Sequence, residues 1–232
     1  MANIPLNIIS SIVELKPRTN VKAREFFIAW NGVPTIAYRG FSRTLLSIKA
    51  EIQRAVPGMK QENPGARWPK TTLGALRDDR TLSWSDAHAL RDICDRFNGE
   101  VNAEPELEIQ ELSVVVFQCR SLERRLLTQP IRLSASKAPH DASPKEHLDE
   151  VEETMACFSR ERLLEYIPLL QHAGNRESHY RATHIEPTLV FDLHKGKPKV
   201  VKEFTKAVDE ALPGAYCWFD PRSLHMTVRG LV

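Results

Sequence analysis

The sequence predicts an α+β fold organised as two pseudo-symmetric lobes. Two observations lead to this expectation. Apolar patterns typical of strands and of helices alternate along the 232 residues. In addition, two parts of the chain repeat one order of elements, namely strand, helix, Pro-Gly, loop and strand.

The first repeat unit begins with a predicted hairpin. Residues 25–30 and 35–38 are β-prone, and the Asn-Gly pair at 31–32 is a strong turn signal between them. A single strand that runs into the next element is the alternative. Ser42 has the side chain of a helix N-cap, and the apolar spacing after it predicts a helix that ends at the Pro-Gly pair 57–58.

The same unit continues with a predicted strand over residues 68–76. Ser83 or Ser85 then caps a second predicted helix, which the Asn-Gly pair at 98–99 is expected to end. Residues 106–118 follow as a strand that finishes in a run of valines and phenylalanine.

The ends and the middle of the chain are less regular. Residues 1–22 fit a short strand, a helix laid over the domain, or a loose arm, and residues 121–133 fit a helix or a strand. Polar residues at 134–148 predict a surface connection. Composition predicts a helix over 145–171 and a loop over 172–181.

The second repeat unit occupies the last part of the chain. Residues 185–193 form its first predicted strand, and the Lys-Gly-Lys sequence at 195–197 its turn. Pro198 is suited to the first turn of a helix, which the Pro-Gly pair 213–214 ends. Residues 223–231 are the closing strand.

The two units agree in spacing to within two residues. The matched pairs of segments are 34–36 with 187–189, 55–58 with 211–214, and 70–76 (KTTLGAL) with 225–231 (HMTVRGL). Two ordinary β-α-β units that coincide by chance are the alternative to a true duplication.

The closing strand holds a histidine and a threonine two positions apart. Because alternate residues of a strand project from one face, His225 and Thr227 are expected to point together. If the repeat is structural, Lys70 and Thr72 occupy the equivalent positions and face this pair across a groove. The alternative is that His225 is a partly buried structural histidine beside ordinary strand threonines.

Composition narrows the class of protein. The formal net charge of +2 gives no strong pull toward nucleic acid or membrane. The four widely spaced cysteines, with no C-x-x-C pair, favour reduced thiols in an intracellular protein. The first residues lack the apolar core of a signal peptide, and no apolar run is long enough to span a bilayer, so a cytoplasmic protein is expected. No histidine pair has the spacing of a helical metal site, so neither a metal nor a cofactor is expected.

The His225 strand resembles the motif of the two-histidine (2H) phosphoesterase superfamily, which includes RNA 2′,3′-cyclic phosphodiesterases and bacterial 2′-5′ RNA ligases. Segment 225–228 matches its His-x-Thr motif, whereas segment 70–72 matches in its threonine and flanks but has lysine in place of histidine. The resemblance covers residues 24–120 and 183–232. It implies two lobes of antiparallel sheet with helices packed outside and a central groove.

The repeat and the resemblance together suggest a division of the chain. An N-terminal arm (1–23) precedes a first lobe (24–133), a connecting helical segment (134–182) and a second lobe (183–232). In the family more chain usually follows the histidine strand. The second lobe is therefore expected to be truncated, or to be completed by earlier segments such as 145–182.

The resemblance also implies a function. Members act on phosphodiesters or 2′,3′-cyclic phosphates, so a phosphate-containing ligand, a nucleotide or an RNA end is the expected partner. In this chain His225 would be the acid or base and Lys70 a charge-stabilising catalytic residue, because lysine with a pKa near 10.4 is a poor base. The residues expected to bind substrate are Thr72, Thr227, Trp68 and Trp218. The alternative is a catalytically degenerate module that binds nucleotide or RNA in the same groove.

Overall fold

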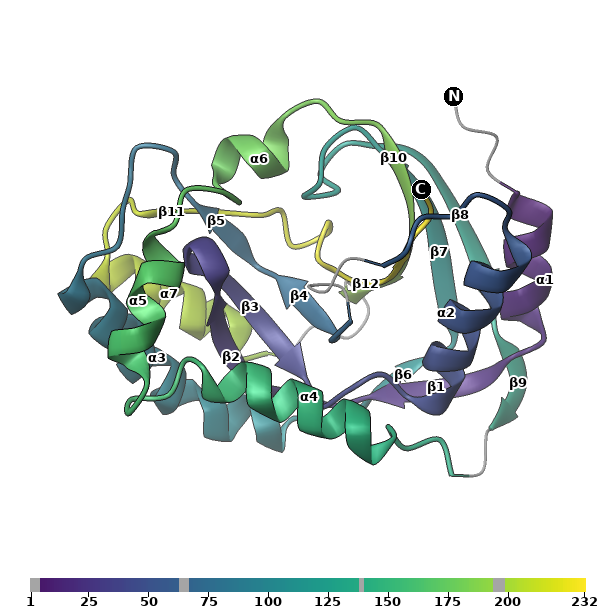
Figure 1. The fold of residues 1–232 in the computed structure, drawn as a ribbon, viewed down its shortest axis with the longest axis horizontal. Coiled ribbons are helices and arrows are strands. Elements are labelled where there is room, and N and C mark those ends of the chain that lie inside the picture. Colours follow the sequence, from purple (N-terminus) through teal and green to yellow (C-terminus); the bar gives the residue numbers. More distant parts are fainter. Residues whose placement is uncertain (1–4, 63–66, 138–139, 194–198) are drawn as a thin grey trace.

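The computed structural model describes residues 5–62, 67–137, 140–193 and 199–232. The fold is α+β, and its sheets are built mainly from antiparallel pairs, as predicted (Figure 1). The predicted turn at 195–197 and Pro198 lie outside the described residues. The elements in chain order are α1 (Leu6–Glu14), β1 (Pro17–Val21), β2 (Ala23–Ala29), the 3₁₀ turn η1 (Trp30–Gly32), β3 (Val33–Tyr38), α2 (Arg43–Ala55), β4 (Lys70–Thr72), β5 (Gly74–Leu76), α3 (Trp84–Ala103), β6 (Leu107–Ile109), β7 (Glu111–Phe117), β8 (Arg125–Arg132), β9 (Ser134–Lys137), α4 (Lys145–Ala156), α5 (Leu163–Gln171), α6 (Glu177–Arg181), β10 (Glu186–Asp192), α7 (Val201–Ala211), β11 (Tyr216–Trp218) and β12 (His225–Gly230).

Two sheets dominate the arrangement. One has the order β2-β3-β4 and the other the order β12-β10-β7-β8, while β6-β1-β9 and β11-β5 are smaller. In Figure 1, β4 and β12 lie side by side near the middle of the molecule, so each large sheet presents its edge strand to the other. The described part of the chain contains no helix that is long and apolar enough to cross a membrane.

Local signals in the sequence explain several of these elements. Asn31 and Gly32 adopt positive φ angles of 65° and 75°, which confirms the predicted turn between β2 and β3. The Ser42 hydroxyl accepts from the backbone N–H of Leu45 and caps α2. Ser83 caps α3, and Asp86 completes the capping box by accepting from the Ser83 backbone N–H.

The helix between the strands of each predicted repeat unit makes a contact with the other large sheet. Helix α7 follows β10 but lies beside β2, where the Phe204 ring stacks on Phe26 with centroids 3.8 Å apart. Helix α2 follows β3 but reaches β12, where the guanidinium of Arg229 donates to the Gln53 amide oxygen. One continuous apolar core therefore includes residues from all parts of the described chain.

Five boundary predictions were wrong. The expected strand 68–76 divides at Leu73 into β4 and β5, because β4 pairs with β3 whereas β5 pairs with β11. The expected strand 106–118 divides in the same way, with β6 on β1 and β7 between β8 and β10. The helix expected over 145–171 is interrupted by a turn between α4 and α5, and the loop expected at 172–181 contains α6. Helix α3 continues past Asn98, whose side chain accepts from the Phe26 backbone N–H instead of ending the helix.

The structure also decides the secondary structure of segments that the sequence left undecided. Residues 1–22 contain a helix and a strand, with Ile9 and Val13 of α1 fully buried. Residues 121–133 form mainly the strand β8, and the surface connection at 134–148 includes the short strand β9. The four cysteines are free thiols.

The stacking of Phe204 on Phe26 generates a stability prediction. Replacing Phe204 by alanine removes a fully buried ring and is expected to lower the free energy of unfolding by about 3–5 kcal/mol. Urea unfolding followed by circular dichroism measures the change. The matched control is Leu164→Ala on α5, where the side chain is 72% exposed and a change within about 0.5 kcal/mol is expected. Equal destabilisation by the two variants would contradict the packing argument.

Candidate functional site

The two strands that carry the predicted residues have matching positions in their sheets. On β4, Lys70 lies opposite Ala37 and Thr72 opposite Thr35 of β3. On β12, His225 lies opposite Asp192 and Thr227 opposite Val190 of β10.

This register changes the alignment of the repeat. With Lys70 aligned on His225, the strand pairing aligns segment 34–36 with 189–191 rather than with 187–189, so the expected match of these segments is two residues out of register. A shift by two keeps every side chain on the same face of its strand.

One cavity of about 330 Å³ is lined by most of the predicted residues. Lys70 and Thr72 of β4 and His225 and Thr227 of β12 all contribute to its wall, together with Trp68. The sequence analysis did not identify the other polar and aromatic residues of the wall, which are Trp30, Thr35, Asn175 and Tyr180.

Trp218 does not line this cavity. Its indole N–H donates to both carboxylate oxygens of Asp209 at 2.9 Å, and its ring stacks on Tyr216. Trp68 does line the cavity but is 6% exposed, with its ring edge-on to Phe27 at 5.8 Å. The structure therefore places Trp218 in a structural contact and Trp68 partly in the core.

His225 has one defined tautomer in this site. Its Nδ1 lies 2.8 Å from the backbone oxygen of Ser223, and because a carbonyl oxygen only accepts, Nδ1 carries the proton. The neutral ring then has its lone pair on Nε2. Burial lowers the pKa of His225 to about 4, and the positive charge of Arg125 acts in the same direction, against the Ser223 carbonyl and Asp192. His225 is consequently neutral at pH 7 and able to accept a proton.

Lys70 is shifted in the same direction by its surroundings. Its ammonium lies over the Trp68 ring, 4.1 Å from the ring centre. Burial lowers the pKa of Lys70 to about 8, and repulsion by the Lys49 ammonium adds to this effect, while Glu62 opposes it. Lys70 is thus mostly protonated at pH 7, but its pKa of about 8 is close enough to neutral pH for it to release a proton.

Lys49, the cation that helps to lower the pKa of Lys70, is itself part of a buried ion pair. Lys49 projects from α2 with its ammonium 3.0 Å from a carboxylate oxygen of Glu62 and 4.0 Å from the centre of the Phe41 ring. Arg229 of β12 lies close enough to lower the pKa of Lys49 further, after burial. Lys49 and Arg229 therefore place positive charge behind Lys70, which Glu62 and Glu150 oppose.

Tyr180 enters the cavity from α6, a helix that the sequence analysis missed. Its hydroxyl is hydrogen-bonded to the Thr72 side chain, and burial raises the pKa of Tyr180 to about 12, so the phenol stays neutral. The short helix is held from both ends: Ser178 Oγ donates to Asp78 at 2.7 Å, and Arg181 forms an ion pair with Glu123 at 3.1 Å. A lone aromatic residue within the polar stretch 172–181 was the only sequence signal for this position.

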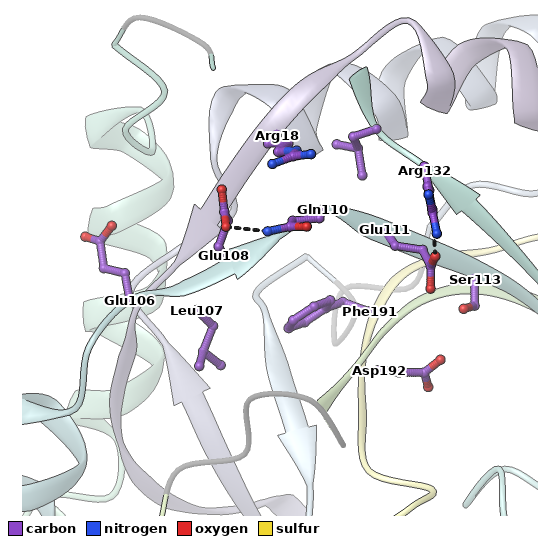
Figure 2. Close-up of a pocket in the computed structure, with 11 residues that line it drawn as sticks. Arg18, Glu106, Leu107, Glu108, Gln110, Glu111, Ser113, Arg132, Phe191 and Asp192 are labelled. Atoms are coloured by element: carbon purple, nitrogen blue, oxygen red, sulfur yellow. Dashed lines mark hydrogen bonds and ion pairs between the residues drawn. The ribbon is translucent and has the colours of Figure 1, made fainter. Parts of the chain in front are cut away.

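A larger hollow of about 640 Å³ lies beside this site and has a different character (Figure 2). Asp192, opposite His225 on the neighbouring strand, faces this hollow and is paired with Arg125 at 2.6 Å. Its other charged lining residues are Arg18, Arg132, Glu106, Glu108 and Glu111. Figure 2 shows Glu111 paired with Arg132 and Glu108 accepting from Gln110. Because carboxylates outnumber cations in this wall, an anionic ligand is favoured in the smaller cavity and disfavoured here.

Within the described residues, no three or more His, Cys, Asp or Glu side chains gather in a way that could hold a metal ion. The smaller cavity is instead built from one cation, one neutral imidazole, hydroxyl groups and aromatic rings. Such a set can bind an anionic oxygen group, accept one proton and donate another.

In comparisons with known proteins, no family model, no curated protein and no solved structure matches this chain.

Proposed function

We propose that this chain is a 2H-type phosphoesterase that acts on a phosphodiester or a 2′,3′-cyclic phosphate of RNA or a nucleotide. The observation that carries the proposal is the shared cavity. Two strands at matching registers bring Lys70 with Thr72, and His225 with Thr227, to the wall of one cavity. On this view the two large sheets are the pseudo-symmetric lobes, and the cavity between β4 and β12 belongs to their central groove.

The proposed reaction is hydrolysis by water. His225 Nε2 takes a proton from the attacking water as its oxygen forms a bond to phosphorus. The bond from phosphorus to the leaving oxygen breaks, and protonated Lys70 gives that oxygen its proton. Hydroxyls of Thr72 and Thr227 donate to the non-bridging phosphate oxygens, where negative charge gathers in the transition state. Tyr180 holds the Thr72 side chain in position.

A binding module is the second candidate, and the state of His225 favours it. A base with a pKa of about 4 has little driving force to remove a proton from water at pH 7. The same cavity would then hold a phosphate group through Lys70 and the threonine hydroxyls without turnover. Bound phosphate would raise the pKa of His225, because a neighbouring negative charge favours the imidazolium form.

Removing the proposed base tests the choice between these candidates. His225→Ala is expected to lower kcat/KM for nucleoside 2′,3′-cyclic phosphates about 10²- to 10⁴-fold, the range for loss of a general base. Product formation followed by chromatography measures the effect. His88→Ala on α3, where the imidazole packs on Trp84 outside the cavity, is the control and should keep full activity. Hydrolysis that survives in His225→Ala would exclude the proposed site, and no hydrolysis by wild type would leave the binding module.

The two shifted pKa values predict a broad bell-shaped pH profile. Activity requires neutral His225 and charged Lys70, so kcat/KM is expected to rise through about pH 4 and to fall through about pH 8. In Lys70→His the alkaline limb should move down toward about pH 6.5, the ordinary value for imidazole. In Lys70→Arg it should disappear from the measurable range. Identical alkaline limbs in the three proteins would show that Lys70 is not the acid.

A variant of Lys49 also tests whether Lys70 is the acid, through the effect of the Lys49 charge on the pKa of Lys70. Replacing it by methionine removes the positive charge that helps to lower the pKa of Lys70, so the alkaline limb should move to higher pH. The exposed Lys206→Met on α7 is the matched control and should leave the limb in place. An unchanged limb in a folded Lys49→Met protein would contradict the electrostatic coupling of the two lysines.

A further inference from the structure

Trp30 lines the cavity and is also partly exposed to solvent. It belongs to η1, between β2 and β3, and lines the same cavity as Lys70 and His225. Its side chain is nevertheless 46% exposed. What distinguishes Trp30 from Trp84, which is 47% exposed outside the cavity, is that its ring lies in the cavity wall within reach of a bound ligand.

The turn that carries Trp30 is fixed from behind. The Asn31 amide donates to the backbone oxygen of His172 at 2.9 Å, and the Arg176 guanidinium donates to the backbone oxygen of Asn31 at 2.5 Å. Gly32 has a φ of 75°, and a Cβ atom there would lie 2.9 Å from the Leu82 side chain. Hydrogen bonds and packing thus fix the backbone of the Trp30 turn before a ligand binds. A ligand that contacts the indole would therefore cause little further loss of conformational entropy in this turn.

The other aromatic rings of the cavity are already engaged. The ammonium of Lys70 covers Trp68, and Tyr180 is buried with its hydroxyl bonded to Thr72. Of the described lining residues, Trp30 therefore has the aromatic ring most available to a ligand.

We propose that Trp30 is the stacking platform for a nucleobase whose nucleoside carries the phosphate bound between Lys70 and His225. The inference adds a subsite for the base to the phosphate site of the proposed nucleotide or RNA substrate. A flat heterocycle stacks on an indole whichever base it is, so little preference among the four bases is expected. This inference rests on the proposed function only for the position of the phosphate.

Kinetics with two substrates tests the platform. Nucleoside 2′,3′-cyclic phosphates are compared with glycerol 1,2-cyclic phosphate, which has the reacting group but no base. Trp30→Ala should raise KM for the nucleoside substrates about tenfold with kcat nearly unchanged, and should leave the glycerol substrate unaffected. Trp30→Phe should recover most of the loss. Trp84→Ala is the matched control, because that indole is 47% exposed on α3 outside the cavity.

Fluorescence gives a readout that does not require catalysis. Binding of AMP should quench tryptophan emission in wild type and in Trp84→Phe, and most of this quenching should be lost in Trp30→Phe, where the buried Trp68 is the tryptophan left in the cavity wall. Such a result supports the platform even if no substrate is hydrolysed. Quenching that persists in Trp30→Phe, or an equal rise in KM for both substrates in Trp30→Ala, would overturn it. In the second case the proposed function would still stand, since both substrates are turned over.

Discussion

The stacking of Phe204 on Phe26 joins the helix that follows one large sheet to a strand of the other. Helix α7 follows a strand of one large sheet, packs on α3 and contacts β2 of the other sheet through Phe204, and α2 follows β3 and reaches β12 through the hydrogen bond of Gln53 with Arg229. These contacts link the two sheets around the place where β4 and β12 lie side by side, and the cavity is lined by residues of both strands.

The central position of β4 and β12 affects the pKa values of Lys70 and His225. Strands at the centre of the molecule bring Lys70 and His225 into surroundings of low polarity, where the charged form of each group is disfavoured. Both pKa values fall, but from different starting points. The lysine arrives near 8 and the histidine near 4, so at neutral pH one is charged and the other is not. Burial thus keeps the imidazole neutral and brings the pKa of the ammonium close enough to neutral pH for Lys70 to release a proton.

Some of this arrangement could be predicted from the sequence because its signals are local. Asn31 and Gly32 determine a turn, and Ser42 and Ser83 determine helix starts, through contacts with residues a few positions away. The partners of a strand are not local information. Nothing in segment 68–76 indicates that residues before Leu73 pair with β3 and those after it with β11. Helix α6 is similar: five residues have little helical preference alone, and Asp78 and Glu123, distant in sequence, hold it in place.

The candidate site was accessible from the sequence for a different reason. Two-residue spacing places Lys70 with Thr72, and His225 with Thr227, on common strand faces whatever the tertiary fold. Aromatic residues carry no such spacing rule. Trp68, Trp218 and Trp30 each lie near a predicted strand end, and only the folded chain distinguishes an indole bonded to Asp209 from one left exposed at the cavity.

Because lysine replaces the second histidine, the acid and the base of the proposed reaction have fixed positions. Two imidazoles of similar pKa could exchange the roles of acid and base, whereas His225 and Lys70 cannot do so at pH 7. Under the proposed function, water must attack from the β12 side and the leaving oxygen must face β4. A base stacked on Trp30 would fix which ribose oxygen that is. If both the proposed function and the Trp30 platform hold, hydrolysis of a 2′,3′-cyclic phosphate yields one phosphate isomer rather than a mixture, because in-line displacement offers the other oxygen no proton donor.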